Sequence, residues 1–259
     1  MQLDNNLQYV VEICETFDEP IPYKDWSIIP IPLTKYFDFA QCSTILDIDK
    51  NAIGDVEIIS MSYLKFLLSV AAREDTTILY KLAVVLNLCL GFDGEVGINI
   101  DEKQRYSLIL KYKDGTQNVM SSRDFDTIRY LILTQNILNY KDTSNLDAAM
   151  KKDLESYYAI KNKGIDAPTL AKRLAIVQSH TGISKSELCK MTIRSFDILF
   201  DTVVEEVDYE VNKPIELNGN VKVDKPTEHW VWKKSKGLFS DAFVSYDGLE
   251  QKINTANGK

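Results

Sequence analysis

The sequence contains few of the residues that break helices. It has 11 glycines and 7 prolines in 259 residues, and four of the prolines lie near the N-terminus, at Pro20, Pro22, Pro30 and Pro32. Proline removes a backbone donor and glycine adds an entropic cost inside a helix, so their scarcity elsewhere favours helices. We therefore expect an α+β fold that is predominantly α-helical: a helical bundle-like core with short β-hairpins near the N-terminal, middle and C-terminal segments.

Paired cysteines and long hydrophobic runs are also lacking. The four cysteines lie far apart, without a CxxC pair: Cys14, Cys42, Cys89 and Cys189. This spacing predicts reduced core residues and no zinc site or disulfide framework. The longest apolar run, around 78–90, contains Lys81 and Asn87 and is too short to cross a bilayer. No basic-then-apolar leader opens the chain, so we expect a cytosolic protein without a membrane partner.

The motifs that accompany common enzymatic chemistry are missing as well. The sequence has no GxxxxGK[ST] phosphate loop, GxGxxG turn, HExxH helix or GxSxG elbow. With only His180 and His229, acid–base chemistry would fall to carboxylates. Two groups of acids that could in principle pair lie in expected connections: Asp93 with Glu95, and Asp101 with Glu102. We therefore expect no enzymatic activity and no cofactor, with a carboxylate-dependent hydrolase as a remaining alternative.

One acidic segment, DIDKNAIGDVEI, contains part of a calcium loop. It supplies ligand-type side chains at the first, third and fifth positions: Asp47, Asp49 and Asn51. Ala52 stands where the sharp turn requires glycine, and Ile58 stands where a bidentate glutamate must close the coordination shell. The segment therefore predicts a polar connection with a turn at Gly54, and no metal.

The N-terminal half combines extended and helical patterns. Its proline-rich segment, 20–32, favours edge-type strands, so we expect a small β element at the N-terminus. Thr34 is placed to cap the helix that follows. Apolar residues spaced by three and four then predict helices over 59–74 and 76–90, packed as a hairpin that ends at Gly91.

A hydrophobic period of two then predicts strands. Segments 96–100 and 106–120 alternate, and Asp114-Gly115 is a strong hairpin turn because glycine tolerates a positive φ. A helix is expected over about 122–138, and a more polar one over about 142–163.

A domain boundary is expected near Lys163-Gly164, where KNKGIDAP combines charge, glycine and proline. It separates a mixed N-terminal domain, 1–163, from a C-terminal domain, 164–259. The second domain begins with three successive helical patterns, TLAKRLAIVQSHTG, SKSELCKM and TIRSFDILFDTVVEEVDYEV, which form a helical corner. Two short strands joined at Asn218-Gly219 are expected to follow, with the rings of Trp230 and Trp232 on one face.

The helical corner has two competing interpretations. Residues 161–194 carry seven positive charges against two acids, which would suit a helix-turn-helix on DNA: Lys161, Lys163, Lys172, Arg173, Lys185, Lys190 and Arg194. However, SKSELCKM offers few side chains that read base edges, and six acids follow within 197–210. We favour a corner that packs within the fold or against a protein, with a DNA-binding regulator as the alternative. An exposed patch of Lys185, Lys190 and Arg194 would favour DNA.

Three segments resemble a known group of proteins. ISMSYLKFLL, GISKSELCKMTIRSFDILFDTV and EHWVWKKSKGLFSDAFVSYDGL are similar to small morphogenesis proteins of tailed bacteriophages, tail assembly chaperones among them. The resemblance is strongest from about Ile183 onward. It implies a mostly helical, non-enzymatic virion assembly factor or minor structural protein. Such a protein binds a phage tail, baseplate or other virion protein in the host cytoplasm, and some of its kind remain in the virion.

Aromatic residues in the C-terminal part are the expected partner contacts. Aromatic side chains often dominate the energetics of protein interfaces, and the paired tryptophans lie next to lysines. We therefore predict a partner-binding set of Phe196, Phe200, Trp230, Trp232, Phe239 and Phe243. The alternative is that the tryptophan rings cover the helical corner.

Overall fold

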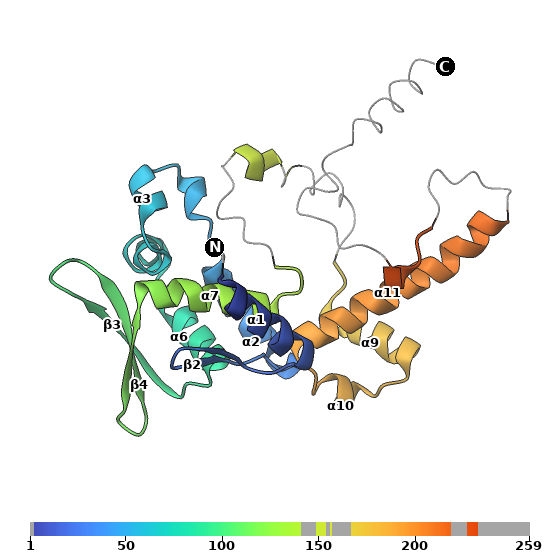
Figure 1. The fold of residues 1–259 in the computed structure, drawn as a ribbon, viewed down its shortest axis with the longest axis horizontal. Coiled ribbons are helices and arrows are strands. Elements are labelled where there is room, and N and C mark those ends of the chain that lie inside the picture. The colour runs from blue at the N-terminus through green and yellow to red at the C-terminus, as the bar shows by residue number, and fades with distance from the viewer. Residues whose placement is uncertain (1–2, 141–148, 154–155, 157–166, 219–226, 233–259) are drawn as a thin grey trace, which may run out of the picture. The chain divides into compact units, whose positions relative to one another are not determined.

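The computed structural model describes residues 3–140, 149–153, 156, 167–218 and 227–232 (Figure 1). The chain divides into two units. The first contains Met1–Asn145 and Leu170–Asp201, and the second contains Leu146–Thr169 and Thr202–Lys259. The described residues confirm the predicted fold class, because the fold is mixed α+β, mostly helical, with two small antiparallel sheets. No helix among the described residues is both long and apolar enough to cross a membrane.

The chain begins with a helix, where the sequence predicted only a β element. Helix α1, Asn5–Phe17, starts at Asp4, whose carboxylate accepts the N–H of Leu7 at 2.8 Å. Its buried residues, Val11 and Cys14, lie one turn apart on a single face. The β prediction was right only for the proline-rich part, where β1, Ile21–Tyr23, pairs with β2, Trp26–Ile28. The helix forms because the first proline occurs only at position 20.

A string of short helical turns follows the hairpin: η1 Leu33–Lys35, α2 Tyr36–Ser43, η2 Thr44–Leu46, η3 Lys50–Ile53, α3 Val56–Ser60, α4 Tyr63–Phe66, the π-helical η4 Leu67–Ala71 and α5 Ala72–Glu74. Thr34 lies inside η1 and does not cap α2, contrary to the prediction. The predicted first helix of the hairpin is interrupted after Ser60, because Ser62 caps a new helix by accepting the N–H of Lys65. The turn at Gly54 is confirmed, with φ at 73°.

The second predicted helix and the middle sheet agree with the sequence. Helix α6, Thr77–Leu90, ends at Gly91, which has a positive φ of 59°. Strands β3 Gly94–Ile100, β4 Tyr106–Tyr112 and β5 Gln117–Ser121 form an antiparallel sheet in chain order. At the β4–β5 turn, Asp114 accepts the N–H of Thr116 at 2.9 Å. Helix α7, Ser122–Asn136, starts directly at the end of β5 (Figure 1).

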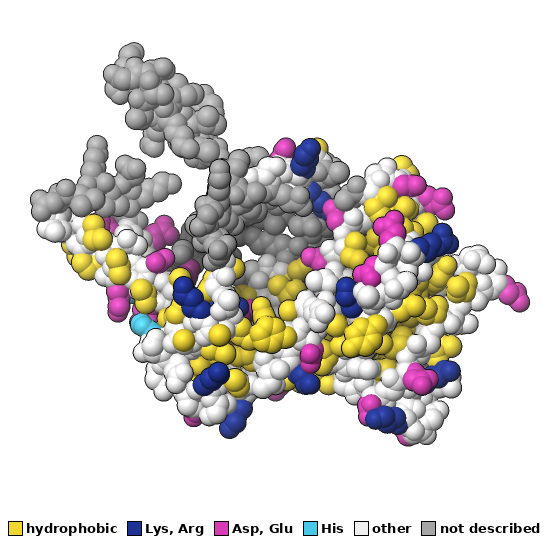
Figure 2. Space-filling view, turned by 180° about the vertical axis from the view of Figure 1, so that it is seen from behind, with side chains coloured by type: hydrophobic (Ala, Val, Ile, Leu, Met, Phe, Trp, Pro, Cys, Tyr) yellow, Lys and Arg dark blue, Asp and Glu magenta, His cyan; other side chains and the backbone are white. Residues whose placement is uncertain are grey.

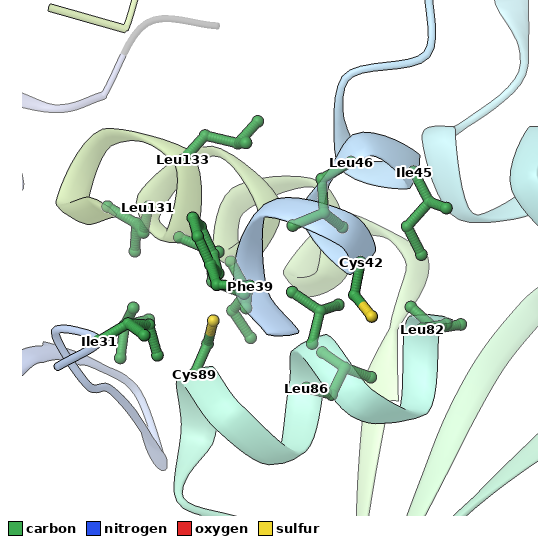
Figure 3. Close-up of a cluster of buried hydrophobic side chains, with 14 of the residues drawn as sticks. Ile31, Phe39, Cys42, Ile45, Leu46, Leu82, Leu86, Cys89, Leu131 and Leu133 are labelled. Atoms are coloured by element: carbon green, nitrogen blue, oxygen red, sulfur yellow. The ribbon is translucent and has the colours of Figure 1, made fainter. Parts of the chain in front are cut away.

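The core of the first unit lies between α2, α6 and α7. Figure 3 shows Phe39 and Cys42 of α2 above Leu86 and Cys89 of α6, with Leu131 of α7 beside them. All of these side chains are buried. All four cysteines are free thiols, but the prediction that they are core residues is right for three of them and wrong for Cys189, which is half-buried. Burial raises the pKa of the Cys89 thiol. The sheet contributes its inner face, because Leu108, Leu110 and Met120 are fully buried.

The helical corner is confirmed as α9 Leu170–Thr181, α10 Lys185–Leu188 and α11 Ile193–Leu217. Ser184 starts α10 with a capping box, in which its hydroxyl accepts the N–H of Glu187 and the Glu187 carboxylate accepts the N–H of Ser184. The boundary predicted at Lys163-Gly164 lies outside the described residues. Residues Leu170–Asp201 belong to the same unit as the first 145 residues. Of the helix predicted over 142–163, residues 149–153 are described and helical.

The predicted C-terminal β-hairpin is wrong for the described residues. Helix α11 continues through Pro214 to Leu217, where the first strand was expected. The residues directly after the predicted turn at Asn218-Gly219, 219–226, lie outside the described residues. In the remainder of the segment expected to be the second strand, Trp230 begins the 3₁₀ turn η5, Trp230–Trp232. The apolar residues of this helix keep a spacing of three and four, which is a helical pattern: Val204, Val207, Val211 and Ile215.

The start of β3 provides a test of the sheet. A Cβ added to Gly94 would lie 1.9 Å from the backbone oxygen of Lys111, whereas one added to Gly97 would meet nothing closer than 3.5 Å, at the Ile109 oxygen. We therefore expect Gly94→Ala to lower the free energy of unfolding by about 2 kcal/mol or more. Gly97→Ala should change it by less than about 1 kcal/mol. Urea unfolding followed by circular dichroism measures both, and equal stability of the two variants would contradict the prediction.

Candidate functional site

Arg194, one of the predicted DNA-binding cations, is an internal residue of the first unit. Its guanidinium donates to Glu15 Oε2 at 2.8 Å and to the carbonyl oxygen of Thr134 at 2.8 Å. Both charged side chains are mostly buried, with exposed fractions of 16% and 13%. The pKa of Glu15 is raised because burial disfavours its charged form, and Arg194 partly offsets this effect. This arginine therefore holds the start of α11 to α1 and α7.

A second group of contacts fixes the same end of α11. Asp18, the residue that ends α1, accepts the hydroxyls of Thr192 at 2.7 Å and Ser195 at 2.6 Å. The backbone adds two hydrogen bonds, from the N–H of Ile193 to the oxygen of Ile31 at 2.9 Å and from the N–H of Leu33 to the oxygen of Met191 at 2.8 Å. We call residues 191–195 and their contacts on α1, α7 and 31–33 the corner clamp.

Arg173 is also internal. It forms an ion pair with Asp197, and its guanidinium lies over the rings of Phe196 and Phe200, 5.3 and 4.7 Å from their centroids. The exposed patch that would favour DNA is therefore incomplete. Lys185 and Lys190 are exposed, whereas Arg194 belongs to the corner clamp. Of the other cations in that set, Lys161 and Lys163 lie outside the described residues.

The predicted partner-binding residues fall into different environments. Phe196 is fully buried in the core of the first unit. Phe200 is half-buried beneath Arg173, and Trp230 is half-buried at the start of η5. Trp232 ends η5, and Phe239 and Phe243 lie outside the described residues. Their role in binding stays a prediction, and the two tryptophans do not share a strand face.

The described part of the second unit contains an apolar surface that the predicted set does not include. Val204, Val207, Val211 and Ile215 are exposed by 38, 40, 55 and 43%. Their spacing places them on one face of α11, which we call the valine stripe. Asp208 and Glu210 are exposed beside it. Along the described part of α11, at the left of Figure 2, hydrophobic and acidic side chains alternate on the surface.

The opposite face of α11 is covered within the second unit. The ring of Tyr209 contacts the ring of His229 in a tilted arrangement, with 4.7 Å between the centroids, and His229 stacks on Trp230 with 5.8 Å between the centroids. Glu216 accepts the N–H of Thr227 at 2.8 Å. At 100° per residue, Tyr209 and Glu216 lie well away from the valine stripe around the helix. The described residues 227–230 thus cover one side of α11 and leave the stripe exposed.

Several of the acidic residues considered for catalysis or metal binding have structural partners. Asp101 accepts the N–H groups of Lys103 and Arg105, each at 2.9 Å, and these hydrogen bonds help to lower its pKa. Asp93 pairs with Lys113 on the surface. In the incomplete calcium loop, Asp49 caps η3. Within the described part of the chain, no three His, Cys, Asp or Glu side chains are grouped so that they could hold a metal.

The corner clamp predicts a large effect of Arg194→Ala on stability. The substitution leaves Glu15 buried without its cation and removes a donor from the Thr134 oxygen. We expect a loss of about 2–3 kcal/mol in unfolding free energy at pH 7. Arg123→Ala, at an exposed arginine outside the clamp, should cost less than about 0.5 kcal/mol.

The same variant should also change the pH dependence of stability. Without Arg194 the folded-state pKa of Glu15 rises further, so the folded state binds a proton more readily than the unfolded state. The stability deficit should therefore shrink as pH falls from 7 toward the unfolded-state value of Glu, about 4.3. Urea unfolding of the wild type and Arg194→Ala at several pH values measures this deficit. A deficit that is constant with pH would show that the charge of Glu15 is not its cause.

No protein-family model, curated protein or solved structure matches this chain.

Proposed function

We propose that this chain is a non-enzymatic assembly factor of a tailed bacteriophage, which binds a tail, baseplate or other virion protein in the host cytoplasm. The observation that carries the proposal is the valine stripe, an apolar helix face exposed on an otherwise acidic protein. The resemblance of the chain to tail assembly chaperones, which is strongest from about Ile183 onward, supports a virion protein as the partner. The role needs a binding surface and no catalytic group.

The chemistry of the stripe specifies the kind of partner. Four aliphatic side chains along one face of a helix suit an apolar groove or a second amphipathic helix. Asp208 and Glu210 beside the stripe favour lysine or arginine at the rim of that groove, since opposite charges at an interface select the partner and its orientation. The expected partner is therefore a virion protein with an apolar groove bordered by basic residues.

Capture from infected cells tests this function. A tagged copy expressed during infection should retain a tail, baseplate or head component, identified by mass spectrometry. Val207→Asp with Val211→Asp should reduce the retained amount at least about tenfold, because two charges would enter an apolar contact. Recovery of no virion component would reject the proposal.

A control with one added charge on the same helix separates the stripe from an effect of charge elsewhere on α11. Asn212→Asp adds a negative charge to an exposed position of the same helix, about 80° around the helix from Val204. This variant should retain the partner to within about twofold, since charges at the rim of an interface contribute little. Because the substituted valines are exposed, the double variant should unfold within about 1 kcal/mol of the wild type. Equal partner loss in both variants would exclude the stripe as the contact.

A DNA-binding regulator, the alternative function, would bind duplex DNA through the cations of the helical corner. Since Arg173 and Arg194 are engaged in ion pairs, the described part of the helical corner has two fewer cations for phosphate contacts than the sequence suggested. We expect no shift of duplex DNA in a gel at low salt. A salt-sensitive shift that disappears in Lys185→Glu/Lys190→Glu would favour the regulator over the assembly factor.

A further inference from the structure

The first unit has a pocket of about 450 Å³ that the proposed function does not use. It lies between the start of α4, the β3–β4 turn and the start of α7, three segments that come together at one end of the sheet (Figure 1). Its described lining is polar apart from one tyrosine: Ser62, Lys65, Asn99, Asp101, Gln104, Arg105, Tyr106, Ser107, Ser121, Ser122 and Arg123. We call it the cationic pocket. Carbon atoms of these side chains and of the backbone form most of the pocket surface, so the charged ends of Lys65, Arg105 and Arg123 are the groups that would select a ligand.

The charges of the lining are unbalanced. Three cations face one acid, Asp101, and this carboxylate is occupied by Arg105, whose Nε donates to it at 2.6 Å. Among the residues that the structure describes, Lys65 and Arg123 have no ion-pair partner. They come from separate elements, α4 and α7. On a chain with a net charge of −8, this pocket concentrates unneutralised positive charge and therefore attracts anions.

The hydrogen bonds within the lining argue against a phosphate-type site. Phosphate sites surround one anion with several free backbone N–H groups, commonly in glycine-rich loops. Here the lining contains no glycine, and the Ser121 hydroxyl caps α7 by accepting the N–H of Asp124. The Ser122 hydroxyl donates to the oxygen of Tyr106 at 2.6 Å. The donors that remain include the long side chains of Lys65 and Arg123 together with short hydroxyls such as that of Ser107. They come from separate segments, and this arrangement suits carboxylates spread along a peptide better than one compact anion.

We propose that the cationic pocket binds an acidic segment of the protein partner, with Lys65 and Arg123 as its charged contacts. This inference rests on the proposed function, because it assigns the acidic segment to the same partner. A volume of about 450 Å³ is within the range of peptide- and ligand-sized sites, and it is large for a single carboxylate. The pocket adds electrostatic selection to the apolar contact made by the valine stripe.

Binding of a fluorescein-labelled hexa-aspartate peptide to the full chain, measured by anisotropy at low salt, tests the inference. We expect Lys65→Glu/Arg123→Glu to weaken binding at least about tenfold, because two attractive contacts become repulsive. Lys185→Glu/Lys190→Glu makes the same change in net charge at two exposed lysines outside the pocket. This control should weaken binding by no more than about twofold. Equal losses in the two variants, or no binding to the wild type, would overturn the inference.

Two further measurements define the ligand class and the folding state. Tripolyphosphate that binds more tightly than hexa-aspartate would overturn the assignment to a peptide. The two charge-reversal variants should have the same thermal unfolding temperature. If Lys65→Glu/Arg123→Glu is less stable than the control, the neutral variant Lys65→Gln/Arg123→Gln replaces it. The neutral variant should still bind hexa-aspartate more weakly than the wild type, and unchanged binding would also overturn the inference.

The experiments can reject the inference about the pocket and the proposed function independently of each other. Val207→Asp/Val211→Asp should bind hexa-aspartate as the wild type does, because its substitutions lie outside the pocket. If cells yield a virion component but hexa-aspartate does not bind, the assembly function stands and the pocket inference falls. If hexa-aspartate binds and no virion component is ever captured, the anion site stands and its assignment to a virion partner falls.

Discussion

The corner clamp is the contact on which the arrangement of the helical corner depends. It joins residues 191–195 to parts of the chain more than a hundred residues earlier, through the Arg194–Glu15 ion pair, the Asp18 carboxylate and two backbone hydrogen bonds to 31–33. A mostly buried ion pair is a weak source of net stability, but it is costly to break and so fixes one arrangement. For this reason Leu170–Asp201 belongs with the first 145 residues.

The clamp also changes how the positive charges of the corner must be interpreted. Seven cations in 161–194 suggested a surface for phosphates, but a count of charges along the sequence does not include partners from distant segments. Arg194 is paired with Glu15, 179 positions away, and Arg173 is covered by its stacking on Phe196 and Phe200. Planar guanidinium groups are well suited to such internal roles, whereas lysines remain at the surface. Lys185 and Lys190 are accordingly exposed at the surface.

Local patterns predicted most elements, and long-range contacts account for what they missed. The Asp114-Gly115 turn, the end of α6 at Gly91 and the three helices of the corner follow from spacing and capping chemistry. The prediction of a C-terminal hairpin is wrong because it placed strands after Val211, where the apolar spacing is helical. The valine stripe was therefore predictable. The cationic pocket was not, because it brings together side chains from three segments that only the folded sheet places in proximity.

Under the two proposals, the valine stripe and the cationic pocket would make physically different contributions to binding, and an assembly factor would need both to be modest. A stable interface buries roughly 800 Å² on each partner, which four aliphatic side chains on one helix do not supply. Apolar contact provides affinity, and complementary charge mainly provides selectivity and a faster encounter. Under these proposals, dividing recognition between a small apolar stripe and a separate cationic pocket would keep each contact weak enough to release. A partner that presents both an apolar groove and an acidic segment is nevertheless distinguished from one that presents only one of them.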